Sequence, residues 1–237
     1  RSQGPFLDVV PVYCRCDWLR GLLHSGSVEA RRTQASDPAA TVASMPLFAC
    51  FDVETTRLDP QSGHIIEIAV VRVERDGTPA GEWTTLINAG TMDVGRSDIH
   101  GIDGEWLPGA PTFLEIAGDL AAELTGCIPV AHNASFDIGF IEAEWSRAGL
   151  GSLDMSALDT LPMARSLDLP GRLSDLSAAL GVTLDDAHQA LGDARALSSV
   201  LLALLDRGAS QGPVPAFALP QLSPPPSRRY QCRPRNS

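Results

Sequence analysis

Two acidic residues, Asp52 and Glu54, stand two positions apart shortly after the apolar residues 47–50. The apolar run is typical of a short buried strand. Because successive side chains on a strand point to opposite faces, the two carboxylates share one face. Two carboxylates at the end of a buried strand repel each other, and a cation between them relieves that cost. The triplet also occurs on solvated loops of acidic chains, so the interpretation as a metal site depends on the rest of the chain.

A third candidate, Asp137, closes the segment 131–137, which reads Ala-His-Asn-Ala-Ser-Phe-Asp. A predicted strand ends near Ala131, and Asn133 or Ser135 can cap the helix that follows. Asp137 then lies in the first helical turn, where N–H groups favour a carboxylate, and an ordinary helix-terminal acid is the alternative interpretation. In open α/β sheets, functional sites gather at the carboxyl ends of parallel strands, where we expect this turn.

The last candidates, His188 and Asp193, stand at the start of the final predicted helix. Asp193 lies beside the buried stripe of this helix, so its carboxylate needs a partner, and no Lys or Arg is evidently placed to supply one. His188 is five residues earlier, about 140° away around an ideal helix. Both side chains therefore reach one site only if His188 precedes the regular helix; a cap or a surface position is the alternative for a lone histidine. The stripe consists of Ala190, Leu197, Leu201 and Leu204.

The rest of the sequence predicts the elements that position these residues. Three strands with short turns between them form an antiparallel meander, and an alternation of helices and strands follows. This order implies an α/β fold, with a mixed five-stranded sheet flanked by helices. The predicted strands are 47–50, 64–73, 83–88, 127–131 and 156–160, and the predicted helices are 111–124, 135–148, 173–180 and about 186–206.

The chain has 237 residues, enough for one domain with a sizeable core. We expect residues 46–207 to form that domain. Residues 1–45 show no sustained period, and we expect a poorly ordered extension there. Residues 208–237 are rich in Pro and Arg and are expected to form a flexible tail.

The net charge of −11 is unevenly distributed: the last 30 residues contain four arginines and no acidic residue, and the chain has no lysine. A predominantly acidic domain repels long duplex nucleic acid, which excludes a protein that coats a polynucleotide along its length. Binding of a short chain end through bound cations is compatible with this charge.

The five cysteines form no Cys-x-x-Cys pair, so neither a disulfide framework nor a zinc site is expected. No apolar run approaches the length that crosses a bilayer, and the N-terminal residues lack a signal-peptide pattern. We therefore expect a cytoplasmic protein that does not bind membranes.

In this order and context, the Asp52-x-Glu54 pair, Asp137, and His188 with Asp193 resemble the DnaQ-like 3′–5′ exonucleases. These enzymes are the four-acid, one-histidine (DEDDh) branch of the ribonuclease H-like fold. The resemblance covers about residues 46–206. Softer matches are Ile65-Ile66-Glu67-Ile68-Ala69, His100-Gly101-Ile102, and Asp159-Thr160-Leu161 with Ala164-Arg165.

The resemblance implies a role for each matching residue. Asp52, Glu54, Asp137 and Asp193 would hold two divalent cations, Mg²⁺ or alternatively Mn²⁺, and His188 would be the general base. Two cations about 4 Å apart neutralise converging carboxylates and stabilise the attacking and leaving oxygens of a phosphodiester. An imidazole can accept a proton from water near neutral pH. Nucleoside 5′-monophosphates would leave one by one from a 3′ end.

The loop after Glu54 supplies the expected substrate contacts. The resemblance implies that Thr55 and Thr56 contact the terminal nucleotide and its 3′-OH. The family pattern has glycine next, where this chain has Arg57, and Arg57 is a candidate phosphate contact. Leu58 is the candidate apolar wedge against the last base.

The leading hypothesis is a 3′–5′ exonuclease of proofreading or repair type that acts on single-stranded DNA 3′ ends, with a DNA polymerase subunit as candidate partner. RNA is the alternative substrate, as in RNase T or oligoribonuclease. A non-catalytic subunit that binds nucleic-acid ends is the alternative from another class. We expect no sliding-clamp interaction, because Pro224 and Pro225 replace the apolar end of a clamp-binding motif that begins at Gln221.

Overall fold

The structure is a computed structural model that describes residues 47–210, Phe217 and Arg235. The expected N-terminal extension, most of the Pro- and Arg-rich tail and the segment 221–225 lie outside the described residues. Within the described part of the chain, no helix is long and apolar enough to span a membrane.

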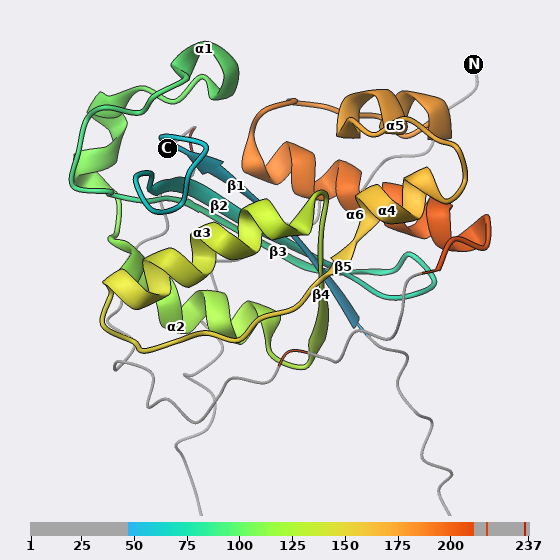
Figure 1. Ribbon diagram of the computed structural model, residues 1–237, viewed down its shortest axis with the longest axis horizontal. Coiled ribbons are helices and arrows are strands. Elements are labelled where there is room, and N and C mark those ends of the chain that lie inside the picture. Colours follow the sequence, from blue (N-terminus) through green and yellow to red (C-terminus); the bar gives the residue numbers. More distant parts are fainter. Residues whose placement is uncertain (1–46, 211–216, 218–234, 236–237) are drawn as a thin grey trace, which may run out of the picture.

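The described strands form one sheet of five strands in the order β3-β2-β1-β4-β5. β1 (Leu47–Thr55), β2 (Ile65–Val73) and β3 (Pro79–Leu86) pair antiparallel, as the meander predicts. β4 (Cys127–Ala131) runs parallel to β1, and the short β5 (Leu158–Asp159) runs parallel to β4. The predicted mixed sheet flanked by helices is therefore confirmed (Figure 1).

Helices follow β3 and then alternate with the later strands. In chain order they are α1 (Ser97–His100), the 3₁₀ helix η2 (Gly104–Gly109), α2 (Phe113–Leu124), α3 (Ala134–Arg147), α4 (Thr160–Arg165), α5 (Leu173–Leu180) and α6 (Ala190–Asp206). The sequence does not predict α1, η2 or α4, because four to six residues show too little apolar periodicity to indicate a helix.

Two groups of helices cover the two faces of the sheet (Figure 1). α2 and α3 pack on one face, where Phe51 and Phe140 are fully buried in the larger apolar cluster. α6 crosses the other face with α4 and α5 beside it, and Leu197 and Leu201 of its predicted stripe pack in a cluster with Phe48. β1 and β2 are thus covered on both sides, which explains their nearly continuous apolar sequences.

β1 is longer than predicted and carries the first two acidic residues. It continues to Thr55, so Asp52 and Glu54 lie near the end of the strand and on one face of it, as predicted. Asp52 stands opposite Ala69 of β2, and Glu54 stands opposite Glu67. Pairing on the β2 side therefore holds both carboxylates on the same face of the sheet.

The final helix begins later than predicted, at Ala190 instead of near residue 186. His188 therefore precedes the regular helix, which is the condition under which it and Asp193 can reach one site. Asp186 and His188 have positive φ angles of 56° and 64°. A regular right-handed helix contains no such residue, so the helix cannot start before position 189.

Candidate metal centre and active site

Three of the predicted acidic residues meet on the face of the sheet that α6 covers. Asp52 and Glu54 come from β1, Asp193 comes from the first turn of α6, and one carboxylate oxygen of each lies within 4.8 Å of the other two. All three residues are partly buried. Carboxylate oxygens are the ligands that Mg²⁺ and Mn²⁺ prefer, so this acidic cluster suits a divalent cation.

Small side chains let α6 lie close enough to the sheet to complete this cluster. Ala69 of β2 packs directly with Ala190 and Ala194 of α6, and the two helical alanines are fully buried on either side of Asp193. Bulkier residues at these positions would hold the helix away from the sheet, because close-packed interiors leave no room for added methylene groups. The alanines therefore set the distance between Asp193 and the strand carboxylates.

Asp137 lies beside the acidic cluster and is held by the backbone of β1. It is buried in the first turn of α3, and its Oδ1 accepts a hydrogen bond from the N–H of Val53 (3.2 Å). Val53 stands between Asp52 and Glu54 in the chain, so this bond attaches α3 to the centre of the carboxylate pair. The set of oxygens within 4.8 Å of one another does not include Asp137.

Asp159, at the end of β5, shapes the turn that presents Asp137. Its Oδ1 accepts hydrogen bonds from the N–H groups of Asn133 (2.9 Å) and Leu161 (2.9 Å), and its Oδ2 accepts one from Ala134 (3.1 Å). Asn133 has a φ of 65°, a left-handed conformation for which asparagine is enriched. The sequence places Asp159 in a motif of the family, but it does not reveal this positioning role.

The gathered carboxyl groups hold protons when no cation is bound. Burial first, and then repulsion from Glu67, raises the pKa of Glu54 to about 8. Burial and repulsion from Asp137 raise the pKa of Asp52 well above its usual value. Burial likewise raises the pKa of Asp137 to about 8, and it raises the pKa of Asp193. A divalent cation favours the ionised forms, so proton release and cation binding are coupled here.

The residues before α6 fold back over its first turn and bring His188 to the acidic cluster. The His188 N–H donates a hydrogen bond to Oδ2 of Asp193 (3.1 Å), and His188 itself is exposed. Gly192 permits this fold, because a Cβ there would lie 2.5 Å from the carbonyl oxygens of both Asp185 and Asp186. His188 is therefore attached to the acidic cluster through its backbone and is exposed to solvent.

Glu67 is a buried carboxylate whose role is not evident from the sequence. Its Oε2 accepts a hydrogen bond from the N–H of Ala190 (3.0 Å), the first residue of α6. The first N–H groups of a helix have no partner inside the helix, so Glu67 caps α6 from the neighbouring strand. The available signal was a single Glu among the apolar residues of β2, since a buried carboxylate requires a partner.

The two predicted threonines take part in the turn between β1 and β2. The hydroxyl of Thr55 donates a hydrogen bond to the carbonyl of Arg57 (2.7 Å). Thr56 is buried, and its hydroxyl accepts a hydrogen bond from the N–H of His64 (3.0 Å). Thr56 therefore fixes the turn next to Glu54.

Arg57 and Leu58 lie at the exposed tip of the same turn. In the described residues, the non-glycine positions with positive φ do not include Arg57, so the turn accommodates arginine where the family pattern has glycine. The Arg57 guanidinium pairs with Asp93 (2.8 Å), which joins this turn to the loop after β3. Leu58 exposes 85% of its surface. The turn thus presents a cation and an apolar side chain close to the acidic cluster.

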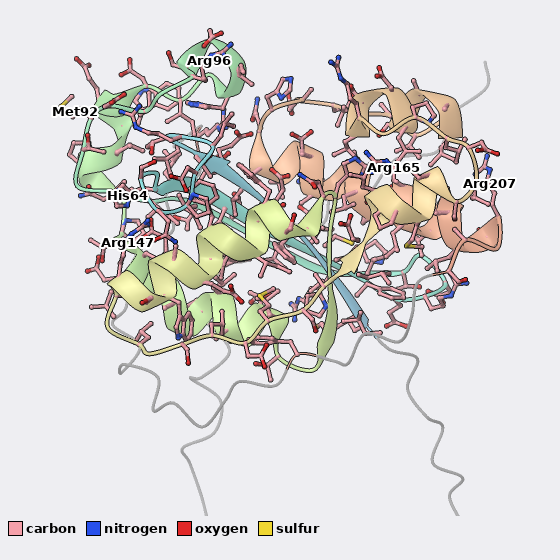
Figure 2. All side chains as sticks on the ribbon, viewed as in Figure 1. His64, Met92, Arg96, Arg147, Arg165 and Arg207 are labelled. Carbon is pink, nitrogen blue, oxygen red and sulfur yellow. The ribbon has the colours of Figure 1, made fainter. Side chains whose placement is uncertain are left out.

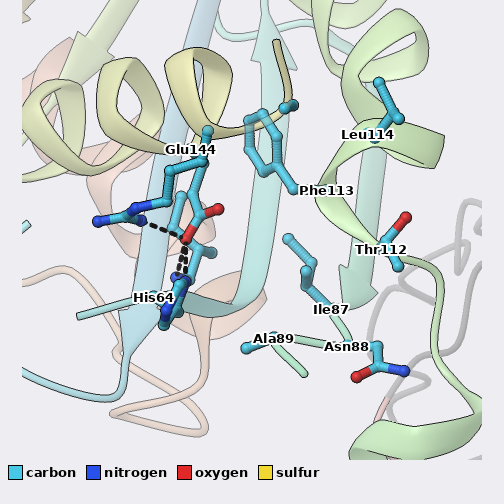
Figure 3. A pocket seen from close by; sticks show the side chains of 11 residues that line it. His64, Ile87, Asn88, Ala89, Thr112, Phe113, Leu114 and Glu144 are labelled. Carbon is cyan, nitrogen blue, oxygen red and sulfur yellow. Dashed lines mark hydrogen bonds and ion pairs between the residues drawn. The ribbon is translucent and has the colours of Figure 1, made fainter. Parts of the chain in front are cut away.

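A separate cavity of about 200 Å³ lies between the start of β2 and the helices α2 and α3 (Figure 3). Glu144 lines it, and its Oε1 lies 2.9 Å from Nδ1 of His64 and accepts a hydrogen bond from Arg147 (2.8 Å). His64 and Arg147 lie close together at this side of the molecule (Figure 2). These contacts attach β2 to α3, and the cavity shares no lining residue with the acidic cluster.

Comparisons with known proteins point to one family. Residues 49–201 match the family model for exonucleases. The chain is 34% identical over 170 residues to the DNA polymerase III subunit epsilon of Treponema pallidum, an alignment of 69% of this chain and 79% of that protein. It is 36% identical over 165 residues to the PolC-type DNA polymerase III of Thermotoga petrophila. That second alignment covers 67% of this chain but only 12% of the polymerase.

Solved structures share the fold at lower sequence identity. A full-length 3′-exonuclease superposes with a TM-score of 0.64 at 14% identity, over 84% of this chain and 76% of that chain. Exonuclease I of E. coli in complex with a dT13 oligonucleotide gives 0.58 at 17% identity, over 70% of this chain and 42% of that chain. The predicted ribonuclease H-like fold is thereby confirmed. The family match covers well over half of the chain, which therefore belongs to the exonuclease family as a DnaQ-like 3′–5′ exonuclease.

Proposed function

We propose that the protein removes nucleotides from the 3′ ends of single-stranded DNA and releases nucleoside 5′-monophosphates. The observation that carries the proposal is the convergence of Asp52, Glu54 and Asp193 within 4.8 Å, with the backbone of His188 bonded to Asp193. Similarity to a DNA polymerase III epsilon subunit supports DNA as the substrate.

Divalent cations, Mg²⁺ or Mn²⁺, suit the acidic cluster because its donors are all carboxylate oxygens at close range. Asp52, Glu54 and Asp193 would hold them, and Asp137 is the fourth acid that we expect to take part. When bound, two such cations stabilise the charge that develops on a phosphodiester during in-line displacement. The protein's own contribution is to hold the four carboxyl groups in place on β1, α3 and α6.

We assign the role of general base to His188. Imidazole is the side chain best suited to take a proton from an attacking water near neutral pH. The position before α6, outside the regular helix, gives the imidazole access to solvent.

The turn after β1 is the proposed site of the terminal nucleotide. Thr55 would contact the nucleotide and its 3′-OH, and Thr56 would contribute by fixing the turn through its bond to His64. Leu58, exposed at the tip, would pack against the last base, and Arg57 would approach a phosphate.

The similarity to polymerase subunits supports a DNA polymerase as partner and, with it, a cytoplasmic location. Mass spectrometry of complexes that co-purify with the full chain from its own cells tests this proposal. Recovery of a replicative polymerase subunit is expected, and its reproducible absence contradicts the proposed partner.

The decisive assay uses 5′-labelled single-stranded DNA and RNA of the same sequence, with Mg²⁺, with Mn²⁺ and with EDTA. We expect a ladder of products shortened one nucleotide at a time from the 3′ end, faster on DNA than on RNA and absent with EDTA. Faster cleavage of RNA supports the ribonuclease alternative. Binding of 3′ ends without any product in Mn²⁺ supports a non-catalytic subunit.

A further inference from the structure

Arg235 brings a cation from the C-terminal part of the chain to the edge of the acidic cluster. Its Nε and Nη2 atoms donate hydrogen bonds to the two carboxylate oxygens of Glu67, at 2.8 and 2.7 Å. Only 9% of the Arg235 side chain and 4% of the Glu67 side chain are exposed. Such a buried, bidentate pair is far more specific than a surface ion pair, because the guanidinium fork matches the carboxylate in only a few orientations.

The same guanidinium contacts two further segments through backbone carbonyl groups. Nη2 donates a hydrogen bond to the carbonyl of His188 (3.2 Å), and Nη1 donates one to the carbonyl of His100, the last residue of α1. Arg235 thus joins three parts of the chain that are distant in sequence: β2, the end of α1 and the segment before α6. A lysine ammonium is a compact point charge and cannot span these acceptors.

His188 is therefore held at both of its backbone polar groups. Its N–H is bound by Asp193, and its carbonyl is bound by Arg235. Two residues later, the N–H of Ala190 donates a hydrogen bond to Glu67, which is itself paired with Arg235. His188 has a positive φ of 64°, an uncommon conformation for a non-glycine residue, and these contacts help to hold it there. Arg235 is one of the groups in contact with this backbone.

We propose that Arg235 is a positioning residue that holds the His188 segment in its active conformation, so that the C-terminal part of the chain completes the exonuclease site. The inference rests on the proposed role of His188 as general base. Arg235 contacts neither substrate nor reacting atoms in this assignment. It acts through Glu67 and the backbone of His188.

The kinetic test measures kcat and KM of the full chain on a short DNA oligomer with Mn²⁺. Arg235→Ala is expected to lower kcat by about 10–100-fold, the usual effect of losing a group that orients a ligand or base, while KM stays within about twofold. Arg235→Lys is expected to restore only part of the loss. Arg228→Ala, which removes the same charge from the same part of the chain, is the matched control and should keep the wild-type kcat.

A double-variant comparison separates positioning of His188 from any general effect on the fold. If Arg235 acts through His188, then His188→Ala and the double variant His188→Ala/Arg235→Ala have the same kcat. The inference is overturned if Arg235→Ala lowers kcat by the same factor in the His188→Ala background as in the wild type. It is also overturned if the kcat of Arg235→Ala is at or above that of the wild type. A wild-type rate in His188→Ala is a different result, since it removes the proposed role of His188 itself.

Amide hydrogen exchange tests the contact without substrate, cation or activity. Peptides that cover residues 186–191 are expected to exchange faster in Arg235→Ala than in the wild type and at the wild-type rate in Arg228→Ala. Unchanged exchange in Arg235→Ala overturns the inference even if the enzyme is active. Unchanged circular dichroism in the same samples confirms that the variants are folded.

Discussion

At the scale of single residues, the acidic cluster places negative groups where only a cation allows all of them to ionise. Asp193→Asn keeps the size and most hydrogen bonds of the side chain but removes a charged ligand oxygen, and Asp52→Ala removes the ligand altogether. Both variants are expected to release no measurable nucleotide while their circular dichroism stays that of the wild type. Calorimetric titration with Mn²⁺ should show weakened binding in each, and full activity with intact Mn²⁺ binding would contradict the assignment.

His188 is predicted to act in the chemical step and not in folding, since its side chain is exposed and only its backbone is bound. His188→Ala should lower kcat by about 10²–10⁴, the usual contribution of a general base. Exposed surface substitutions cost little stability, so the melting temperature should change by no more than a few degrees. Steady-state kinetics and thermal melting of the two proteins measure both quantities, and a wild-type kcat in His188→Ala would contradict the assignment.

Glu54 gives the metal-free protein a pH-dependent stability. Its pKa is about 8 in the folded state, chiefly through burial, whereas an unfolded glutamate titrates near pH 4. The folded state therefore binds more protons between these values, so the free energy of unfolding falls as the pH rises from about 4 to about 8. Glu54→Gln carries no titrating group and should lose less stability over this range. Urea unfolding in EDTA at pH 5 and pH 8 measures both proteins, and equal losses would contradict the burial of Glu54.

At the scale of elements, the first turn of α6 contacts both the sheet, through Glu67, and the segment that contains His188. Gly192→Ala would place a Cβ 2.5 Å from two backbone carbonyl oxygens, so the segment 185–188 must shift. The expected result is a loss of about 1–3 kcal/mol of unfolding free energy, typical of overpacking, together with a lower kcat. Gly118→Ala on α2 is the matched control, because its Cβ would meet no atom within 4 Å. That control should be as stable as the wild type or more stable, since alanine favours a helix over glycine.

Local patterns in the sequence were enough to predict most elements. The strand 127–131 and the helix 173–180 have the predicted bounds, because apolar runs and a terminal glycine mark them clearly. The boundary of α6 was wrong by about four residues. Asp186 and His188 are acceptable helix residues by composition, but both have a left-handed backbone, and His188 is bound there by Asp193 and by the distant Arg235.

The site residues were predictable only where their position depends on local sequence patterns. The alternation of a strand places Asp52 and Glu54 on one face, and the structure brings Asp193 to them. The pairing of Glu67 with Ala190 and Arg235 was not predictable, because these residues are 123 and 168 positions from Glu67. A single sequence shows periodicity along the chain, but it does not show which distant polar groups form hydrogen bonds with each other.

At the scale of the whole molecule, the net charge of −11 limits how strongly the protein holds a nucleic acid. Few phosphates can be neutralised by side chains, so we expect the enzyme to dissociate after removing one or a few nucleotides. Digestion of a labelled single strand with an excess of unlabelled competitor added at the start of the reaction measures this. Short ladders are expected, and complete digestion of a subset of strands would show a processive grip instead.

Two residues from the C-terminal part of the chain attach at opposite ends of β1. Phe217 is buried in the core, where its backbone exchanges hydrogen bonds with Gly126 and Cys127 beside the start of β1, and Arg235 binds Glu67 opposite Glu54 near its end. A protease cut between them would leave the inner attachment in place and release the outer one. The remaining fragment would keep the Phe217 contacts but leave the buried Glu67 carboxylate without its guanidinium partner, so it should be less stable than the parent and turn over slowly. A chain truncated before Arg235 would show the same loss of turnover.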